Sequence, residues 1–524
     1  GDQSVNNNPV GRLKRVFGGP PTASALGPTP VKEQDIDKVS RKKMNLVRQK
    51  INQAYEALTV HFRRVSEDER DGMENAAAAE DQDSVDSESI VDACEIKRRV
   101  TYCSTVRLKT VQSVKKAREF MDKIYPQLFE YAVIVGLNPK TDDPGYEPYV
   151  IHKFPQTAKS NVSVPKFCFP DAEEFRPGSA AALSESYSFV LTNIDGGRLF
   201  GYCRRIQLLS EIEARRCKSL DHAQEMIAAS FGRPMPKAGK VCHIRSLDDK
   251  GEMETIFLER PTDCRLTNVN YESLLSYLGT EKLIKVFASM LMERRLILCS
   301  RHLSILTQTI HALAALLYPF HWQHVYIPIL PADMLDVCAA PTPFIIGILQ
   351  SHLARVTSMD LEDVIIVDLD KKQVLRSAGD EMTLLPKKVQ RALKTALNMC
   401  KIDSDAQSSQ WLMVSEAFLR MFVETVGHFG QYISTQQDGT KTFQREQFML
   451  GTPSKGIRQF LEWFTETQMF ELFITMQLER QSWGNLFMSR LHEYKSQPES
   501  SHKGIGRRVK NIGKAIKTKL KEAT

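Results

Sequence analysis

Blocks of apolar and polar positions in the middle of the chain predict an α/β core. Short runs at Arg295–Ser300, Val325–Leu330 and Asp363–Leu369 are almost continuously apolar, as expected for strands buried on both faces. Leu303–Leu317 carries apolar residues on every turn, and Phe344–Leu353 follows a Pro-rich turn, so both segments are predicted to be helical. Strands that alternate with helices in this way predict a largely parallel sheet covered on both sides.

The segments upstream of this core predict strands of another kind. Tyr131–Leu137, Pro148–Pro155 and Gly251–Arg260 each have a strand pattern, and Ser188–Ile206 predicts a hairpin with Asp195-Gly196 in its turn. Residues 215–228 have a helical pattern. A curved antiparallel sheet with flanking helices, joined to the core by a linker near residues 261–271, would form one of two lobes with a cleft between them.

The chain ahead of these strands differs in composition. Residues 1–29 are rich in Gly, Pro and Asn and are predicted to be disordered. Met44, Val47, Ile51, Ala54 and Leu58 share one helix face, which predicts either a short coiled coil or a strut packed on the body, with a solvated helix as the alternative. Residues 66–95 have the acidic composition of a linker. The N-terminal quarter is therefore predicted to be an appendage.

The C-terminal residues 493–524 have the pattern of a basic amphipathic helix. Apolar residues recur on one stripe between residues 505 and 520, which is typical of a helix that lies on an anionic membrane. A solvated or disordered tail is the alternative, and nucleic-acid binding is disfavoured because no aromatic residue interleaves with the bases. The membrane-binding candidates are Lys503, Arg507, Arg508, Lys510, Lys514 and Lys517.

Composition predicts a cytosolic protein that does not span a membrane. The 524 residues carry a formal net charge of +7, and no stretch of about 20 residues is continuously apolar. The ten cysteines are scattered without a regular spacing, which argues against both a disulfide framework and a zinc module. The first residue is Gly1, so we expect the sequence to be a fragment.

Candidate chemistry is sparse. No glycine-rich loop follows the strand that ends at Ser300, and Gly451–Gly456 lacks the phosphate-loop spacing, so a nucleotide-dependent enzyme is disfavoured. His311, His321 and His324 are expected to be structural rather than metal ligands. Glu293 beside Arg294 is an acid or base candidate, although a charge pair that caps a buried strand is the commoner explanation. We predict no covalent catalysis, no metal, no cofactor and no small-molecule substrate.

Several segments of the chain together resemble the DENN family, and their amino-acid sequences most resemble its class 2 subfamily. The resemblance runs in order from about residue 122 to residue 482. The segments of the central module are Glu293-Arg294, Ala314–Phe320, Trp322–His324, Tyr326–Pro328 and Ala340–Phe344. Those of the upstream module are Pro126–Leu137, Phe167–Asp171 and Ser188–Ile206, and those of the downstream module are Phe418–Phe429, Phe443–Met449 and Gln459–Ile474.

The resemblance implies the domain order of the chain. An extension at residues 1–121 would precede a longin-like upstream module at 122–262, an α/β central module at 270–400 and a helical downstream module at 411–492. The fold class is therefore α/β with two lobes, in which the downstream module completes the second lobe.

The resemblance also implies a function. DENN modules are guanine nucleotide exchange factors for Rab GTPases, so we expect this chain to bind GDP-bound and nucleotide-free Rab between its lobes. It would act in the cytoplasm and on endosomal, Golgi or vesicle membranes. A scaffold without exchange activity is the alternative. The interface candidates lie in three loops: Asp195, Gly196 and Arg198; Trp322, Gln323 and His324; and Pro341, Thr342 and Pro343.

Overall fold

The computed structural model describes most of the chain between residues 91 and 495. All contacts reported below lie within one compact unit, Val47–Thr524. The Asp195-Gly196 turn, the helical pattern at 215–228, most of the acidic segment and the basic tail lie outside the described residues. The described ranges are 48–55, 91–121, 129–140, 145–158, 162–173, 185–192, 198–205, 241–247, 253–259, 273–402, 407–479 and 484–495, with a few shorter stretches between them.

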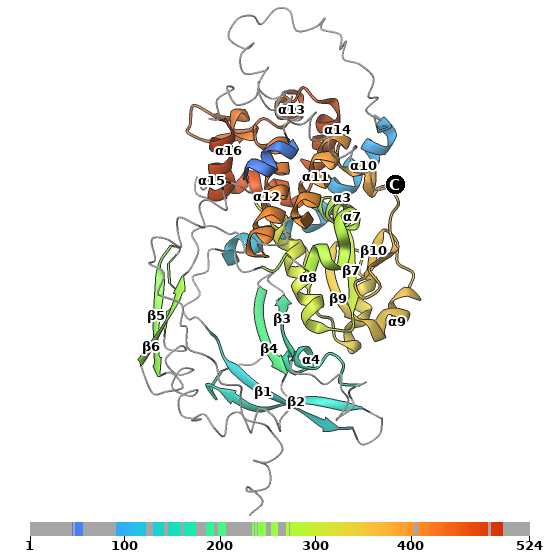
Figure 1. Cartoon of the computed structure of the whole chain (residues 1–524), viewed down its shortest axis with the longest axis vertical. Coiled ribbons are helices and arrows are strands. Elements are labelled where there is room, and N and C mark those ends of the chain that lie inside the picture. Colours follow the sequence, from blue (N-terminus) through green and yellow to red (C-terminus); the bar gives the residue numbers. More distant parts are fainter. Residues whose placement is uncertain are drawn as a thin grey trace, which may run out of the picture. The chain divides into compact units, whose positions relative to one another are not determined.

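The upstream strands pair in antiparallel fashion, as predicted. Within the described residues they form three two-stranded sheets: β1–β2, β3–β4 and β5–β6 (Figure 1). The predicted hairpin is confirmed, since Thr192 pairs with Arg198 at the end of the β3–β4 ladder. The element bounds are β1 Ala132–Pro139, β2 Tyr146–Phe154, α4 Val164–Cys168, β3 Glu185–Thr192, β4 Arg198–Arg205, β5 Val241–Leu247 and β6 Met253–Glu259.

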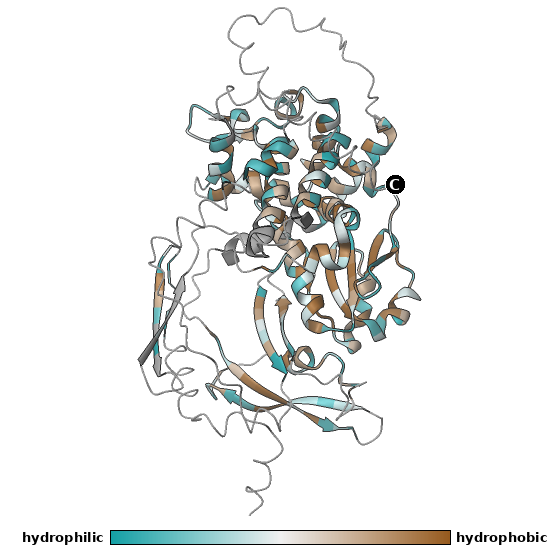
Figure 2. Ribbon diagram, viewed as in Figure 1, coloured by the Kyte–Doolittle hydropathy of each residue, from teal (hydrophilic) through white to brown (hydrophobic). Residues whose placement is uncertain are grey.

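The central sheet confirms the predicted α/β core. Its strand order is β11-β10-β7-β9-β8, and every neighbouring pair is parallel except β10–β11 at one edge. Figure 2 shows these inner strands largely in the hydrophobic colour, in keeping with strands buried on both faces. The strands are β7 Arg295–Ser300, β8 Val325–Ile327, β9 Phe344–Leu349, β10 Val364–Asp368 and β11 Gln373–Arg376.

The helix predicted at Phe344–Leu353 is wrong for its first six residues, which form strand β9. All six side chains of β9 are buried, so the segment has no polar face to present to water as a surface helix would. The packing of β9 in turn requires a glycine at position 347, since a Cβ there would lie 2.0 Å from the carbonyl oxygen of Pro328, which follows β8. The helical turns begin only after Leu349, with η3 Gln350–His352 and α9 Leu353–Thr357.

Helices surround the sheet and make up the C-terminal part. Among the described residues, no helix is both long and apolar enough to cross a bilayer. The further helices between residues 274 and 402 are η1 Leu274–Leu278, α7 Gly279–Leu291, α8 Leu303–Ala315, η2 Ala332–Ala339, α10 Glu381–Leu384 and α11 Lys387–Ile402. Next come α12 Gln407–Val426, η4 Phe429–Tyr432, β12 Ile433–Thr435, β13 Lys441–Phe443, α13 Arg445–Leu450, α14 Lys455–Phe464, α15 Gln468–Glu479 and α16 Asn485–Lys495.

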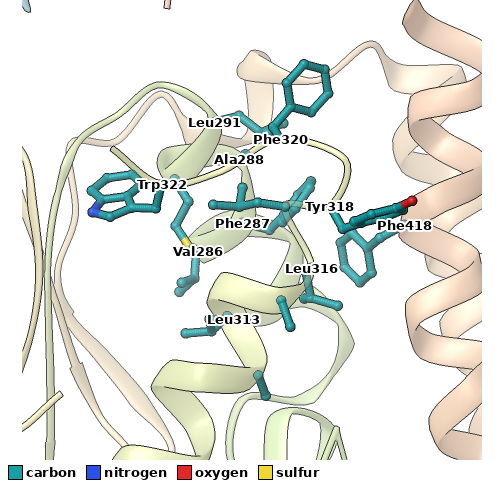
Figure 3. Packing of buried hydrophobic residues seen from close by; sticks show 14 of the residues in the cluster. Val286, Phe287, Ala288, Leu291, Leu313, Leu316, Tyr318, Phe320, Trp322 and Phe418 are labelled. Atoms are coloured by element: carbon teal, nitrogen blue, oxygen red, sulfur yellow. The ribbon is translucent and has the colours of Figure 1, made fainter. Parts of the chain in front are cut away.

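Aromatic side chains connect the central module to the C-terminal helices. Phe287 of α7 packs against Phe418 of α12 with ring centroids 4.5 Å apart (Figure 3). Phe320, in the loop after α8, contacts Phe422 at 4.9 Å and Phe473 at 4.8 Å. Such ring contacts add to the free energy gained by burying large apolar surfaces. Since they join the central and downstream modules, these two predicted modules share one core.

The N-terminal helix α3 (Ala93–Met121) packs on the body instead of forming part of an appendage, which corrects the prediction. Arg99 is 2 % exposed and donates to the carbonyl oxygen and hydroxyl of Thr383 at 3.0 and 2.6 Å. Earlier in the chain, the helical residues 48–55 favour the predicted strut: Ile51 is fully buried, and the Tyr55 hydroxyl donates to Ala417 O at 3.0 Å.

Candidate functional site

Helix α8 meets the β3–β4 hairpin through His311. The ring Nε2 of His311 lies 2.7 Å from Ser188 Oγ on β3, and its Nδ1 lies 2.6 Å from the hydroxyl of Tyr326 on β8. Burial lowers the pKa of His311 to about 4, so the ring is neutral at pH 7 and donates at one nitrogen and accepts at the other. His311 is thus the hydrogen-bonded structural histidine that the sequence predicted.

Arg198 joins two of the three predicted interface loops. Its Nη2 donates to the carbonyl oxygens of Trp322 at 2.9 Å and His324 at 2.8 Å. Its guanidinium carbon also lies 5.3 Å from the ring centre of Tyr326. Burial lowers the pKa of Arg198, yet an arginine stays charged at neutral pH, so these carbonyl contacts are charge-assisted.

The Trp322–His324 loop is held mainly from within. Trp322 is 4 % exposed, and its indole donates to Val325 O at 3.1 Å, so its side chain is a buried anchor of the loop. His324 is also buried, and its Nε2 lies 3.3 Å from Glu293 Oε2. Gln323 is only partly buried and donates to His321 O at 3.2 Å. Gln323 therefore offers more side-chain surface to a partner than Trp322 or His324.

The third predicted loop lies beside the second at one edge of the central sheet. Val325 and Phe344 are register partners in parallel strands, so the residues that precede them emerge at the same edge. Pro341 is exposed, Thr342 is partly buried and Pro343 is buried. We call Arg198, Gln323, Pro341 and Thr342 the amino-edge surface. Asp195 and Gly196 lie outside the described residues.

Glu293 has a structural role that its sequence neighbours do not reveal. Its fully buried carboxylate accepts hydrogen bonds from the backbone N–H groups of Gln468 at 3.0 Å and Met469 at 2.8 Å, where α15 begins. A negative charge at a helix N-terminus is favourable, and the carboxylate accepts from two of the N–H groups that have no partner within the helix. Glu293 therefore caps a helix about 175 residues later in the chain, instead of pairing with a charge at the start of β7.

Arg294 has a different partner from its neighbour Glu293. It forms a two-pronged ion pair with Asp380 at 2.6 and 2.8 Å, and Arg99 of α3 lies 3.4 Å from the same carboxylate. Burial by itself raises the pKa of Asp380, but the hydrogen bonds and charge of Arg294, with the charge of Arg99, bring that pKa below its usual value. No local sequence pattern indicates this triad, because its members are far apart along the chain.

Three family profiles match the chain in order. The uDENN domain profile matches residues 148–206, the DENN (AEX-3) domain profile matches residues 199–372, and the dDENN domain profile matches residues 443–489. The amino-edge surface falls within the first two of these matches.

Relatives extend the likeness over most of the chain. It is 37 % identical to human DENN domain-containing protein 2A over 453 residues and 35 % identical to human DENN domain-containing protein 2B over 468 residues. These alignments cover 76 % and 79 % of this chain but only 45 % and 41 % of those relatives, so the chain spans less than half their length. Mouse DENN domain-containing protein 2D is 33 % identical over 411 residues, which cover 70 % of this chain and 87 % of that relative.

Proposed function

Because the chain belongs to the DENN family and groups with its class 2 subfamily, we propose that it is a guanine nucleotide exchange factor for a Rab GTPase in membrane traffic. The observation that carries the proposal is the ordered match to all three domains of the module. The alternative, a scaffold that binds a GTPase without exchange, remains an outcome of the test below.

The proposed mechanism is differential binding. The chain would bind the nucleotide-free, switch-opened GTPase more tightly than the GDP-bound form, and this difference would lower the affinity for GDP. GTP would then enter and displace the exchange factor. Such a reaction requires a contact surface of ordinary protein-interface size and no covalent step.

We place part of this contact on the amino-edge surface. Arg198 brings the β3–β4 hairpin against the Trp322–His324 loop, so a partner seated there would touch both the upstream and the central module. The exposed Pro341 and the partly exposed Gln323 would supply contact area beside it. Trp322, His324 and Pro343 would support the loops from beneath.

The experiment is the release of fluorescent GDP from a panel of purified Rab GTPases at micromolar concentrations of this protein. We expect strong acceleration for one or a few Rabs. Arg198→Ala should slow that release by about tenfold, equivalent to about 1.4 kcal/mol in the barrier. Arg376→Ala is the matched control, because Arg376 is an exposed arginine on β11, at the sheet edge opposite β8. Equal affinity for GDP-loaded and nucleotide-free Rab, without acceleration, would instead indicate a scaffold.

We also propose that the basic C-terminal residues attach the protein to an anionic membrane surface. This proposal rests on the sequence pattern of Lys503, Arg507, Arg508, Lys510, Lys514 and Lys517, which lie outside the described residues. Peripheral attachment would place the exchange factor beside a lipid-anchored GTPase on endosomal, Golgi or vesicle membranes. Deleting residues 504–524 should reduce binding to liposomes that contain phosphatidylserine, and unchanged binding would refute the attachment.

A further inference from the structure

The exposed face of helix α11 is basic. The helix contains four lysines, one arginine and no acidic residue among its 16 residues. Lys387, Arg391 and Lys394 are exposed and follow one another at steps of four and three, so they share one face of the helix. Lys394 forms an ion pair with Glu281 of α7 at 2.5 Å, which compensates for one of these charges. We call Lys387, Lys388, Arg391 and Lys394 the α11 basic face.

Positive charge is unfavourable at the start of α11. Lys387 and Lys388 lie in its first turn, where N–H groups without a partner in the helix give this end a partial positive charge. A carboxylate close to these lysines would therefore stabilise the helix end as well as pair with the side chains.

The chain enters helix α3 beside this end of α11. Val91 N donates to Gln459 Oε1 of α14 at 3.4 Å, and Gln459 Nε2 donates to Val91 O at 3.1 Å. Val91 and Lys387 line the same small pocket, which α3, α10 and α14 also border. The residues that precede Val91 are thus joined to the body next to the first turn of α11.

The residues that precede Val91 are strongly acidic. Residues 66–90 hold ten carboxylates and one arginine, a net charge of −9, whereas the whole chain carries +7. Asp83, Asp86 and Glu88 are among the last eight residues before Val91. Eight extended residues span up to about 26 Å. Since α11 is about 24 Å long, even these last carboxylates can reach the whole α11 basic face.

The acidic residues are also attached near α11 on their other side. The Tyr55 hydroxyl donates to Ala417 O of α12, and α12 packs against α11. Residues 56–90 are therefore attached at both ends to the helices that surround α11. Contact with α11 is then intramolecular, with an effective concentration on the order of millimolar, so that individually weak ion pairs suffice.

We propose that the α11 basic face is the docking surface for the acidic residues 66–90 of the same chain. Carboxylates of this segment pair with Lys387, Lys388 and Arg391 and cover their positive charge, so any other anionic partner has to displace the segment first. The ion pairs lie at the surface, and the docking therefore weakens as salt shortens the screening length from about 10 Å at 0.1 M to about 3 Å at 1 M.

The test is cross-linking of the full chain with a carbodiimide, which joins a carboxylate to a lysine amine only where the two are in contact. Peptide mass spectrometry of the monomer should show cross-links from residues 66–90 to Lys387, Lys388 or Lys394. We expect them to be about tenfold more abundant than those to Lys166, an exposed and ion-paired lysine of α4. Raising the salt from about 0.05 M to about 1 M should reduce them severalfold.

A double variant identifies the surface without removing the reactive amines. Lys387→Gln/Arg391→Gln should lower the cross-links to Lys388 and Lys394 about fivefold, although both amines remain. Lys371→Gln/Lys372→Gln is the matched control, because it removes the same charge from exposed residues at the turn after β10 and should leave the cross-links unchanged. Far-UV circular dichroism checks that each variant is folded.

Three results would overturn the proposal. Cross-links to Lys166 could be as abundant as those to α11, or Lys387→Gln/Arg391→Gln could retain the cross-links to Lys388 and Lys394. The third is that phosphatidylserine liposomes bind the unaltered chain and this double variant abolishes the binding, because the α11 basic face would then be open to a membrane.

Discussion

Buried polar side chains determine how distant elements of this chain meet, because each is stable only with its hydrogen-bonding partners in place. Arg490 of α16 and Glu416 of α12 form a two-pronged pair with both distances at 2.9 Å, and both residues are almost fully buried. Removing one member of such a pair leaves an uncompensated buried charge. His311 is neutral but also needs its hydrogen-bonding partners because it is buried. Its burial makes the free energy of unfolding depend on pH.

We predict that His311 makes the protein less stable in mild acid. Its pKa is about 4 in the folded chain and about 6.5 when unperturbed, so between these values the unfolded chain binds more protons. Stability is therefore fully present above about pH 6.5 and is lost as the pH falls toward 4. In His311→Gln this loss should be smaller, by at most about 3 kcal/mol, as measured by urea unfolding across that range.

His302→Gln is the control for this prediction, because His302 is exposed at the start of α8. It should retain the pH dependence of the original protein. If His311→Gln and the original protein lose stability in parallel between pH 6.5 and pH 4, the ring of His311 is not held neutral by burial.

At the scale of elements, the central sheet depends on close backbone approach at Gly347 of β9. A Cβ there would lie 2.0 Å from Pro328 O and 2.8 Å from Ile310 Cδ1 of α8, and a backbone oxygen cannot move aside cheaply. Gly347→Ala should therefore lower the free energy of unfolding by about 3 kcal/mol, as overpacking does in a tight core. Thermal and urea unfolding measure the loss.

Gly430→Ala is the matched substitution. No described heavy atom lies within 4 Å of a Cβ built at Gly430, and its backbone is not in the left-handed region. Its free energy of unfolding should change by less than about 0.5 kcal/mol. A Gly347→Ala variant as stable as Gly430→Ala would mean that β9 does not pack against Pro328 as closely as described.

The elements that sequence patterns predict well are those whose pattern is local. The buried strands β7 and β10 follow from short apolar runs, helix α8 from apolar residues on every turn, and the β3–β4 hairpin from strand patterns around an Asp-Gly turn. Strand β9 does not, since a short apolar run has the same composition in a buried strand and a buried helix, and only its neighbours distinguish them. The environment of the predicted interface loops could not be predicted from local sequence either. The burial of Trp322 and the role of Arg198 depend on contacts between segments more than 100 residues apart.

The packing of helix α3 on the body was also not predicted, for a physical reason. Its sequence is mainly polar, which indicates a solvated helix, yet Arg99 is buried through ion pairs with Glu95 and Asp380. Arginine can be buried when its fork of donors is matched by fixed acceptors. Two of those acceptors, Asp380 and Thr383, lie at the start of α10 almost 300 residues away, so no local pattern indicates them.

At the scale of the whole molecule, residues 48–55 and helix α3 belong to the fold that would carry the activity. Helix α3 packs on α14 and α15, Tyr102 donates to Glu293 O at 3.1 Å, and Ser104 Oγ lies 3.2 Å from a carboxylate oxygen of Glu466. Residues 48–55 add a second attachment, in which Arg48 lies 3.5 Å from Glu493 of α16. A chain shortened to begin at Asp122 would lose both attachments.

We therefore predict that a chain beginning at Asp122 is less stable than the full chain by more than about 3 kcal/mol, because the partly buried Asp380 and the buried Glu293 lose partners in α3. A chain beginning at Asn45 keeps both attachments and should melt at the same temperature as the full chain.

The rates of GDP release with these two chains distinguish inhibition by the first residues from loss of the fold. Faster release from the Asn45 chain than from the full chain would show that the first 44 residues inhibit exchange. Slower release from the Asp122 chain would follow from loss of the fold. An Asp122 chain that unfolds at the temperature of the full chain would show that α3 contributes no stability, and the N-terminal quarter would then be an appendage after all.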